Sequence, residues 1–136
     1  MELKDKITVV TGAASGIGRA LCHAFAEEGA AHVVCVDVNG EGAAETARAV
    51  GGTAFTVDVR HAEQITAMID RVEAEIGPID LFFSNAGIAV GGGLDTPDAE
   101  WQRSWEINVM SHIWAARHLV PLMAARGGGY LLNTAS

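Results

Sequence analysis

Three glycines near the start of the chain have the spacing of a phosphate-binding turn. Gly12, Gly16 and Gly18 follow a short β-branched run at residues 7–10 and open a segment with helical periodicity. In such a turn the first glycine permits the tight bend, the second lets the backbone approach a pyrophosphate, and the third lets helix and strand pack closely. The N-terminus of the following helix offers free N–H groups and a partial positive charge to the anion. Alone, these glycines would also be compatible with ordinary turn and cap residues.

A carboxylate at the end of the next apolar run supports the phosphate-binding interpretation. Asp37 stands nineteen positions after Gly18, where its side chain can accept hydrogen bonds from both hydroxyls of an adenosine ribose. A hydrogen bond to a charged group contributes about 1.5–3 kcal/mol. The same charge would repel a 2′-phosphate, and no basic residue stands at the neighbouring positions to offset it, which are Ala13, Ala14, Val38 and Asn39. The sequence therefore favours NAD over NADP.

The whole chain resembles the classical short-chain dehydrogenase/reductase family. Its motif runs Thr-Gly, three residues, Gly-x-Gly, with Thr11 before the first glycine. Asp58, after the third predicted strand, matches the family's adenine-contacting aspartate. Residues 84–87, Ser-Asn-Ala-Gly, match its Asn-Asn-Ala-Gly segment, with Ser84 in place of the first Asn. The resemblance implies that the cofactor contacts Gly12, Ser15, Gly16, Ile17, Gly18, Asp37, Asp58, Val59, Asn85, Ala86 and Gly87.

Two catalytic positions of the family also have counterparts. Asn108 matches the Asn that holds a water in the proton relay, and Ser136 matches the Ser that hydrogen-bonds the substrate carbonyl or hydroxyl. The family's mechanism also needs a Tyr as general acid or base, and a Lys four positions later that lowers the pKa of that Tyr. The one tyrosine, Tyr130, is followed at that spacing by Thr134 and opens a predicted strand, so it is interpreted as a strand residue. The family's Tyr would lie beyond Ser136, and we expect this chain alone to bind better than it reacts.

These residues need an alternating series of strands and helices to hold them. Apolar runs predict strands at 7–10, 32–37, 53–57, 79–84 and 130–135. Helical periodicity predicts helices from 17 to about 29, from about 41 to 50, and from 65 to 76. A long helix is predicted from about 99 to 126, capped by Asp98 and kinked or shortened by Pro121. Three glycines at 91–93 predict a flexible loop.

Alternating strands and helices predict an α/β fold with right-handed crossovers. We expect one Rossmann-type domain over residues 1–136, with a parallel sheet in the order 3-2-1-4-5 and helices on both faces. That order places the ligand crevice beside the first strand, where the glycine-rich turn lies. Judged by the family, the domain is C-terminally incomplete, which would leave the apolar fifth strand as an uncovered sheet edge.

The composition excludes several classes of function. A formal charge of −8 without any basic run argues against nucleic-acid binding. Neither a signal peptide nor a bilayer-spanning apolar stretch of about 20 residues is present, so we expect a cytoplasmic protein without membrane contact. The five histidines show no metal-ligand spacing. Cys22 and Cys35 are interpreted as buried free thiols.

The sequence leaves two functions open. The first is an NAD-dependent short-chain dehydrogenase or reductase, in which this chain supplies the cofactor half of a site for an alcohol or carbonyl substrate. The second is a dinucleotide-binding module without redox chemistry; a methyltransferase of Rossmann type is disfavoured by the family motifs. Trp101, Trp105 and Trp114 near the long helix fit either core packing or contacts in a homo-oligomer. We expect the isolated chain to be poorly soluble or oligomeric.

Overall fold

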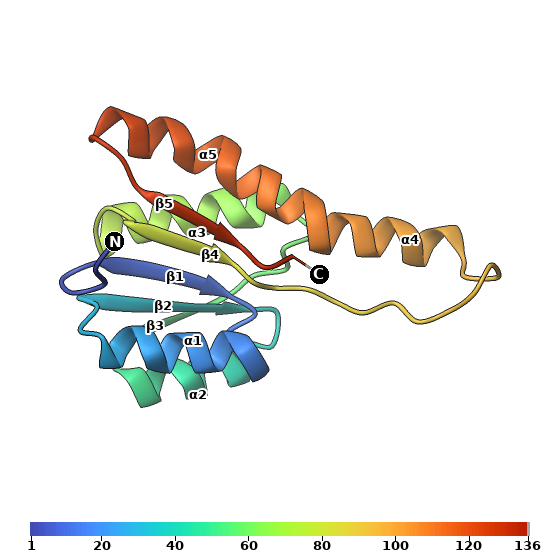
Figure 1. Ribbon diagram of the computed structural model, residues 1–136, viewed down its shortest axis with the longest axis horizontal. Coiled ribbons are helices and arrows are strands. Elements are labelled where there is room, and N and C mark those ends of the chain that lie inside the picture. Colours follow the sequence, from blue (N-terminus) through green and yellow to red (C-terminus); the bar gives the residue numbers. More distant parts are fainter. Residues whose placement is uncertain (136) are drawn as a thin grey trace.

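The computed structural model describes residues 1–135, so the predicted substrate contact Ser136 lies outside the described residues. It contains a five-stranded sheet between two layers of helices (Figure 1). The strands are β1 (Ile7–Thr11), β2 (His32–Asp37), β3 (Thr53–Thr56), β4 (Leu81–Ser84) and β5 (Tyr130–Asn133). Their order is β3-β2-β1-β4-β5, and every neighbouring pair is parallel. The predicted fold class and strand order are confirmed.

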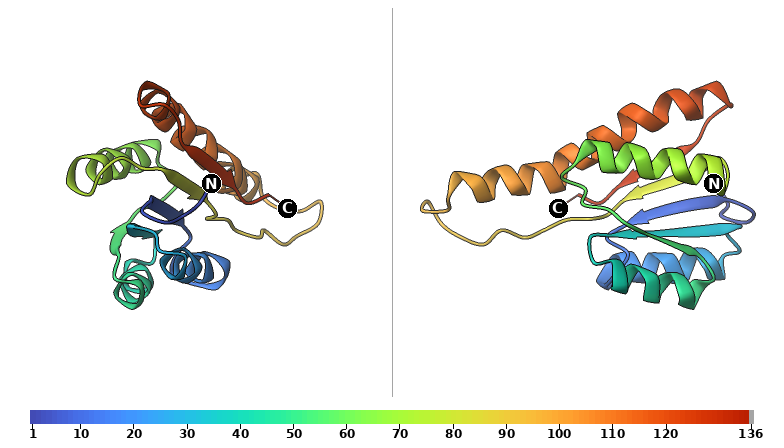
Figure 2. Two further views of the ribbon diagram at one scale, coloured as in Figure 1. Left: turned by 60° about the vertical axis from the view of Figure 1, so that its left-hand side comes forward. Right: turned by 180° about the vertical axis from the view of Figure 1, so that it is seen from behind.

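Helices cover both faces of this sheet. The helices α1 (Gly16–Glu27) and α2 (Gly40–Val50) lie on one face, and α3 (Ala62–Glu75) and α5 (Ser111–Ala125) lie on the other (Figures 1 and 2). Side chains alternate between the two cores, as a pleated strand requires. Val9 of β1 packs in the core under α3 and α5, whereas the next residue, Val10, packs in the core under α1 and α2.

Three strands are shorter than the apolar runs predict. The structure ends β3 at Thr56, begins β4 at Leu81 and ends β5 at Asn133. Two of the extra residues, Val57 and Ile79, are nevertheless buried in the core, whereas Thr134 and Ala135 are exposed. Burial, which sets the sequence pattern, therefore extends beyond the hydrogen-bonded ladder.

The long helix is irregular at a π-helical segment in its middle, whereas the sequence predicted an irregularity at Pro121. It comprises α4 (Asp98–Trp105), the π-helical segment η1 (Glu106–Met110) and α5. Pro97 rather than Asp98 is the N-cap, and the helix runs past Pro121 to Ala125, so of the two predicted effects of Pro121, a kink or a shortening, the shortening does not occur. Pro121 and Arg117, whose carbonyl would accept the missing N–H, are both exposed, so water can hydrogen-bond to that carbonyl.

The tryptophans on this helix fall into two groups. Trp114 is half-buried and packs against the core formed with α3, whereas Trp101 and Trp105 are 63% and 53% exposed. Core packing therefore explains Trp114 but neither of the other two. Within the described residues, no helix combines the length and apolar character needed to cross a membrane.

Candidate functional site

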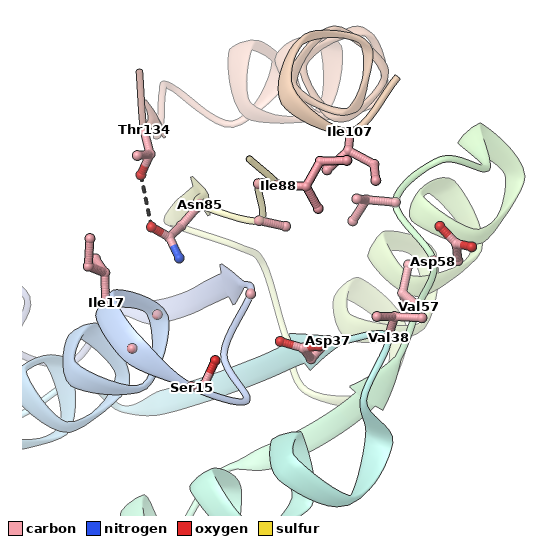
Figure 3. A pocket seen from close by; sticks show the side chains of 16 residues that line it. Ser15, Ile17, Asp37, Val38, Val57, Asp58, Asn85, Ile88, Ile107 and Thr134 are labelled. Carbon is pink, nitrogen blue, oxygen red and sulfur yellow. Dashed lines mark hydrogen bonds between the residues drawn. The ribbon is translucent and has the colours of Figure 1, made fainter. Parts of the chain in front are cut away.

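A cleft of about 580 Å³ opens at the carboxyl ends of the strands (Figure 3). It lies between the N-terminus of α1, the ends of β2 and β3, and the segment that follows β4. All eleven residues predicted to contact a cofactor line it, namely Gly12, Ser15, Gly16, Ile17, Gly18, Asp37, Asp58, Val59, Asn85, Ala86 and Gly87. The structure therefore brings together residues that are up to 75 positions apart in the chain.

The glycines of the turn have three different surroundings. Gly12 has a φ of +73°, which side-chain-bearing residues rarely adopt, and Gly16 has a φ of +52°. A Cβ on Gly18 would overlap the carbonyl oxygen of Gly12, so only glycine lets α1 approach β1 this closely. A Cβ on Gly16 would meet no atom within 4 Å, because this part of the backbone borders the open cleft. The turn therefore has the close packing and the free backbone surface that phosphate binding requires.

Asp37 is held in place by the same turn. One carboxylate oxygen, Oδ2, accepts a hydrogen bond from the backbone N–H of Ala14 at 2.9 Å, and Oδ1 accepts one from the N–H of Asn39 at 2.9 Å. Each oxygen keeps a second lone pair for a ligand donor. The carboxylate lies at the rim of the cleft beside Val38, facing the N-terminus of α1 across the opening (Figure 3).

Asp58 forms the acidic rim at the far end of the cleft. Its carboxylate accepts hydrogen bonds from both the backbone N–H and the guanidinium of Arg60, with Nε 3.0 Å from each oxygen. Hydrogen bonding from Arg60 holds the pKa of Asp58 below its ordinary value of 3.8. The carboxylate is therefore ionised at neutral pH and acts only as an acceptor. Val57 and Val59 flank it and give this end an apolar surface.

Asn85 connects three strands beneath the cleft. Its backbone N–H donates to Thr11 Oγ1 at 2.9 Å, and its side-chain amide donates to the carbonyl of Thr11 at 3.2 Å. Thr134, just after β5, donates its hydroxyl proton to Asn85 Oδ1 at 2.9 Å (Figure 3). Asn85 thus joins the ends of β1, β4 and β5. Ser84, which replaces the family's first Asn, is buried at the end of β4.

Asn108 lies in η1 and binds the backbone of the segment after β4. Its Oδ1 accepts from the N–H of Ile88 at 2.9 Å, and its Nδ2 donates to the carbonyl of Ile88 at 2.9 Å. The second Nδ2 hydrogen is directed to Ser104 Oγ at 3.1 Å. One amide hydrogen and Oδ1 therefore anchor the loop, while the other amide hydrogen bonds within the long helix. Asn108 contacts a second cavity rather than the first.

This second cavity, of about 610 Å³, adjoins the first along residues 85–88. Asn108 and His112, one helical turn apart, line it together with Ala135 at the end of the described chain. Burial lowers the pKa of His112 from its ordinary value of 6.5. Its imidazole is therefore neutral at physiological pH.

Five residues line the first cleft without having been predicted from the sequence. They are Val38, Val57, Ile88, Ile107 and Thr134. The position of Val38 directly after Asp37 was an available signal. Ile107 and Thr134 reach the cleft only through the tertiary arrangement of η1 and β5, which no local pattern reports.

Tyr130 lies at the end of β5 farthest from the cleft. It opens the strand and pairs with Leu81, whereas the strand end near the cleft is Asn133. Its interpretation as a strand residue is confirmed. No group of three His, Cys, Asp or Glu side chains among residues 1–135 is arranged to hold a metal ion.

Comparison with known proteins shows the same family along the chain. Residues 6–136 match the family described as short chain dehydrogenase. The 7α-hydroxysteroid dehydrogenase of Escherichia coli K12 is 33% identical over 100% of this chain and 55% of its own length. Epidermal retinol dehydrogenase 2 of Homo sapiens is 36% identical over 99% of this chain and 46% of its own length.

Solved structures agree with these sequence matches. A 7α-hydroxysteroid dehydrogenase in complex with NADH and 7-oxo glycochenodeoxycholic acid superposes with a TM-score of 0.91 at 31% identity. The match covers 99% of this chain and 55% of that one. The chain thus spans about half the length of the curated relatives it matches.

Proposed function

Because the chain belongs to the short-chain dehydrogenase family, we propose that it supplies the NAD-binding half of an oxidoreductase site for an alcohol or ketone. The observation that supports this most directly is the carboxylate of Asp37 held on the backbone of the glycine-rich turn. This arrangement joins an acceptor for ribose hydroxyls to a surface for a pyrophosphate. The relative solved with NADH gives the proposal a precedent within the family.

The residues present fit an extended dinucleotide. The free N–H groups at the start of α1 would bind the pyrophosphate, and the open backbone at Gly16 leaves room for it. Asp37 would accept from the adenosine ribose, and the apolar surface beside Asp58 would contact the adenine. Asn85 and Gly87 would border the second ribose, since they line the part of the cleft nearest the second cavity. When bound, NAD supplies the hydride acceptor; the protein supplies orientation.

We propose NAD rather than NADP because of the charge at Asp37. A 2′-phosphate there would lie against a carboxylate that two backbone N–H groups already fix in place. Arg19 is the basic side chain close to this turn, but its guanidinium donates to the carbonyl of Ala14 and lies 3.6 Å from Glu45. It is therefore engaged with protein groups of the opposite polarity.

On the substrate side, the roles of Asn108 and Ser136 remain proposals carried by the family resemblance. Asn108 fixes the loop through Ile88, and one Oδ1 lone pair is left that could hold a water of a proton relay. Holding cofactor and substrate together accounts for much of the rate in such reactions. We further propose a homo-oligomer, since Trp101 and Trp105 are exposed on α4.

Titration calorimetry with NAD and NADP tests the cofactor assignment. We expect the unmodified chain to bind NAD more tightly, and Asp37→Ala to weaken NAD binding about tenfold or more while weakening NADP binding less. Asp95→Ala removes the same charge from an exposed loop position and serves as the control. Tighter binding of NADP by the unmodified chain would overturn the assignment.

A dinucleotide-binding module without redox chemistry is the second candidate. It is favoured by the position of Tyr130, the chain's one tyrosine, at the strand end away from the cleft. Measuring NADH formation with a panel of secondary alcohols tests this candidate, because a module without redox chemistry gives no turnover. Turnover by this chain would exclude the module.

A further inference from the structure

The two cysteines of the chain lie together in the core beneath the glycine-rich turn. Cys22 belongs to α1 and Cys35 to β2, and both are fully buried. Their sulfur atoms are 3.6 Å apart and share a hydrogen bond. The sequence predicted buried free thiols, which is confirmed, but it did not indicate that they touch.

This contact joins two of the elements that border the proposed dinucleotide site. Cys22 is one helical turn beyond Gly18, the glycine that packs α1 against β1. Cys35 is two residues before Asp37 on β2. A covalent bond between the sulfurs would therefore connect the phosphate-binding helix to the ribose-binding strand.

We propose that Cys22 and Cys35 form a reversible disulfide when exposed to a small hydroperoxide, and that this disulfide weakens dinucleotide binding. The site itself is independent of the proposed function, whereas its effect on binding rests on that function. Because the chain has two cysteines, one intramolecular disulfide would consume both.

Either thiol can start the reaction, because the two sulfurs lie 3.6 Å apart in one buried pair. Once deprotonated, one of them attacks the peroxide as a thiolate. Its sulfur bonds to one peroxide oxygen as the O–O bond breaks, and the other oxygen leaves with a proton. The second thiol then displaces the sulfenic oxygen as water, so that two thiols are oxidised while hydrogen peroxide is reduced to water.

We expect closure of the disulfide to draw α1 toward β2. A disulfide holds its sulfurs at about 2.0 Å, so the present separation of 3.6 Å must shrink by about 1.6 Å. At Gly18 the helix lies so close to the turn that an added Cβ would overlap Gly12 O, so a shift of α1 would be passed on to the turn. The N–H groups that would meet the phosphates would then lose their alignment.

The full burial of both sulfurs means that the oxidant reaches them only when α1 opens locally. We therefore expect slow oxidation by hydrogen peroxide, at a rate that bound NAD reduces because it holds α1 closed. A bulky alkylating reagent should react more slowly still with the folded chain. Slow oxidation that bound NAD slows further, together with even slower alkylation, would indicate that reagents reach the sulfurs through local opening of α1.

Mass spectrometry combined with NAD titration tests the proposal. After peroxide treatment we expect a monomer that has lost two hydrogen atoms and has no thiol left to alkylate after unfolding. Its dissociation constant for NAD should rise about tenfold, the equivalent of one lost hydrogen bond to phosphate. Dithiothreitol should restore both properties. Cys22→Ala and Cys35→Ala should each bind NAD normally and lose the response to peroxide.

Three results would overturn the proposal: two thiols that stay free, a sulfinic acid without a cross-link, or a disulfide that leaves NAD binding unchanged. Reduced protein that binds no NAD would instead contradict the proposed function, while the thiol count still decides the disulfide site. Should an alanine variant not fold, Cys35→Val keeps a β-branched residue in β2 and serves in its place.

Discussion

Gly16 and Gly18 stand two positions apart in one turn but face different neighbours. A Cβ on Gly18 would overlap a backbone carbonyl of the turn, whereas a Cβ on Gly16 would enter the open cleft. We expect Gly18→Ala to lower the free energy of unfolding by about 3 kcal/mol, as overpacking against a backbone does. Gly16→Ala should cost about 1 kcal/mol, from its φ of +52°. Urea denaturation measures both.

Among molecules that remain folded, we expect NAD affinity to be reduced more by Gly16→Ala than by Gly18→Ala, the reverse of their effects on stability. Gly16→Ala places a methyl group where the phosphates would lie, so we expect its NAD affinity to fall more than tenfold. The matched control is Gly51→Ala, which has a similar φ of +67° and equally open surroundings at the end of α2. It should lose similar stability and no affinity. Equal NAD binding by the Gly16 and Gly51 variants would contradict the role of the turn.

His112 gives the chain a stability that depends on pH. Because burial lowers its folded pKa below 6.5, the unfolded chain binds the proton more readily. This contribution is complete above about pH 7 and declines as the pH falls through 6.5 toward the lower folded value. We expect His112→Gln to reduce the loss of stability between pH 7.5 and 5.5, measured by urea denaturation. Parallel pH profiles of variant and unmodified chain would contradict this assignment.

At the scale of elements, η1 and the loop after β4 depend on one side chain. Asn108 makes hydrogen bonds to both backbone groups of Ile88. Its replacement by alanine leaves two partly buried groups without their partner, at a cost of about 2 kcal/mol. We expect the Ile88 amide to exchange its hydrogen much faster in Asn108→Ala. Ser104→Ala removes one bond to the Asn108 amide and should leave that protection nearly intact. Unchanged exchange at Ile88 in Asn108→Ala would refute the anchoring role.

The sequence indicated most elements but not this irregularity. Strands β1 and β2 are buried on both faces, so each is a nearly continuous apolar run that a local pattern detects. The glycine turn and Asp37 were also predictable, because their chemistry is local. The anchoring of η1 to the loop was not, because the partner of Asn108 lies twenty positions away in the chain. The contact between Cys22 and Cys35 likewise requires the packing of α1 on β2.

At the scale of the whole molecule, the two halves of the sheet differ in how they are covered. Around β1 and β2 both faces carry helices, whereas β5 is a sheet edge with α5 on one face (Figure 2). Leu131 packs toward α5, but Tyr130 and Leu132 are 49% and 43% exposed. Together with the free backbone of an edge strand, these side chains form a surface suited to association. We define it as the β5 edge surface, residues 130–133.

The net negative charge of the chain opposes association through the β5 edge surface, and the salt concentration determines whether this repulsion or the apolar attraction dominates. The net charge of −8 repels a second copy over a distance that shrinks to about 8 Å at physiological ionic strength. The apolar attraction is not screened in this way. We therefore expect the chain to self-associate, and more strongly as salt concentration rises. Sedimentation velocity at low and high salt measures the effect; a monomer at every salt concentration would contradict it.

Substituting one residue on each surface should show whether copies of the chain associate through the β5 edge surface or through the exposed face of α4. Leu132→Lys places a charge on the edge strand where the side chain is already partly in water, so the fold should tolerate it while association weakens. Trp105→Lys introduces the same charge on α4, where a homo-oligomer contact was the alternative. We expect the strand variant to lower the sedimenting mass more, because the edge adds unpaired backbone groups to its apolar side chains. Greater dissociation by Trp105→Lys would instead assign the contact to the α4 surface.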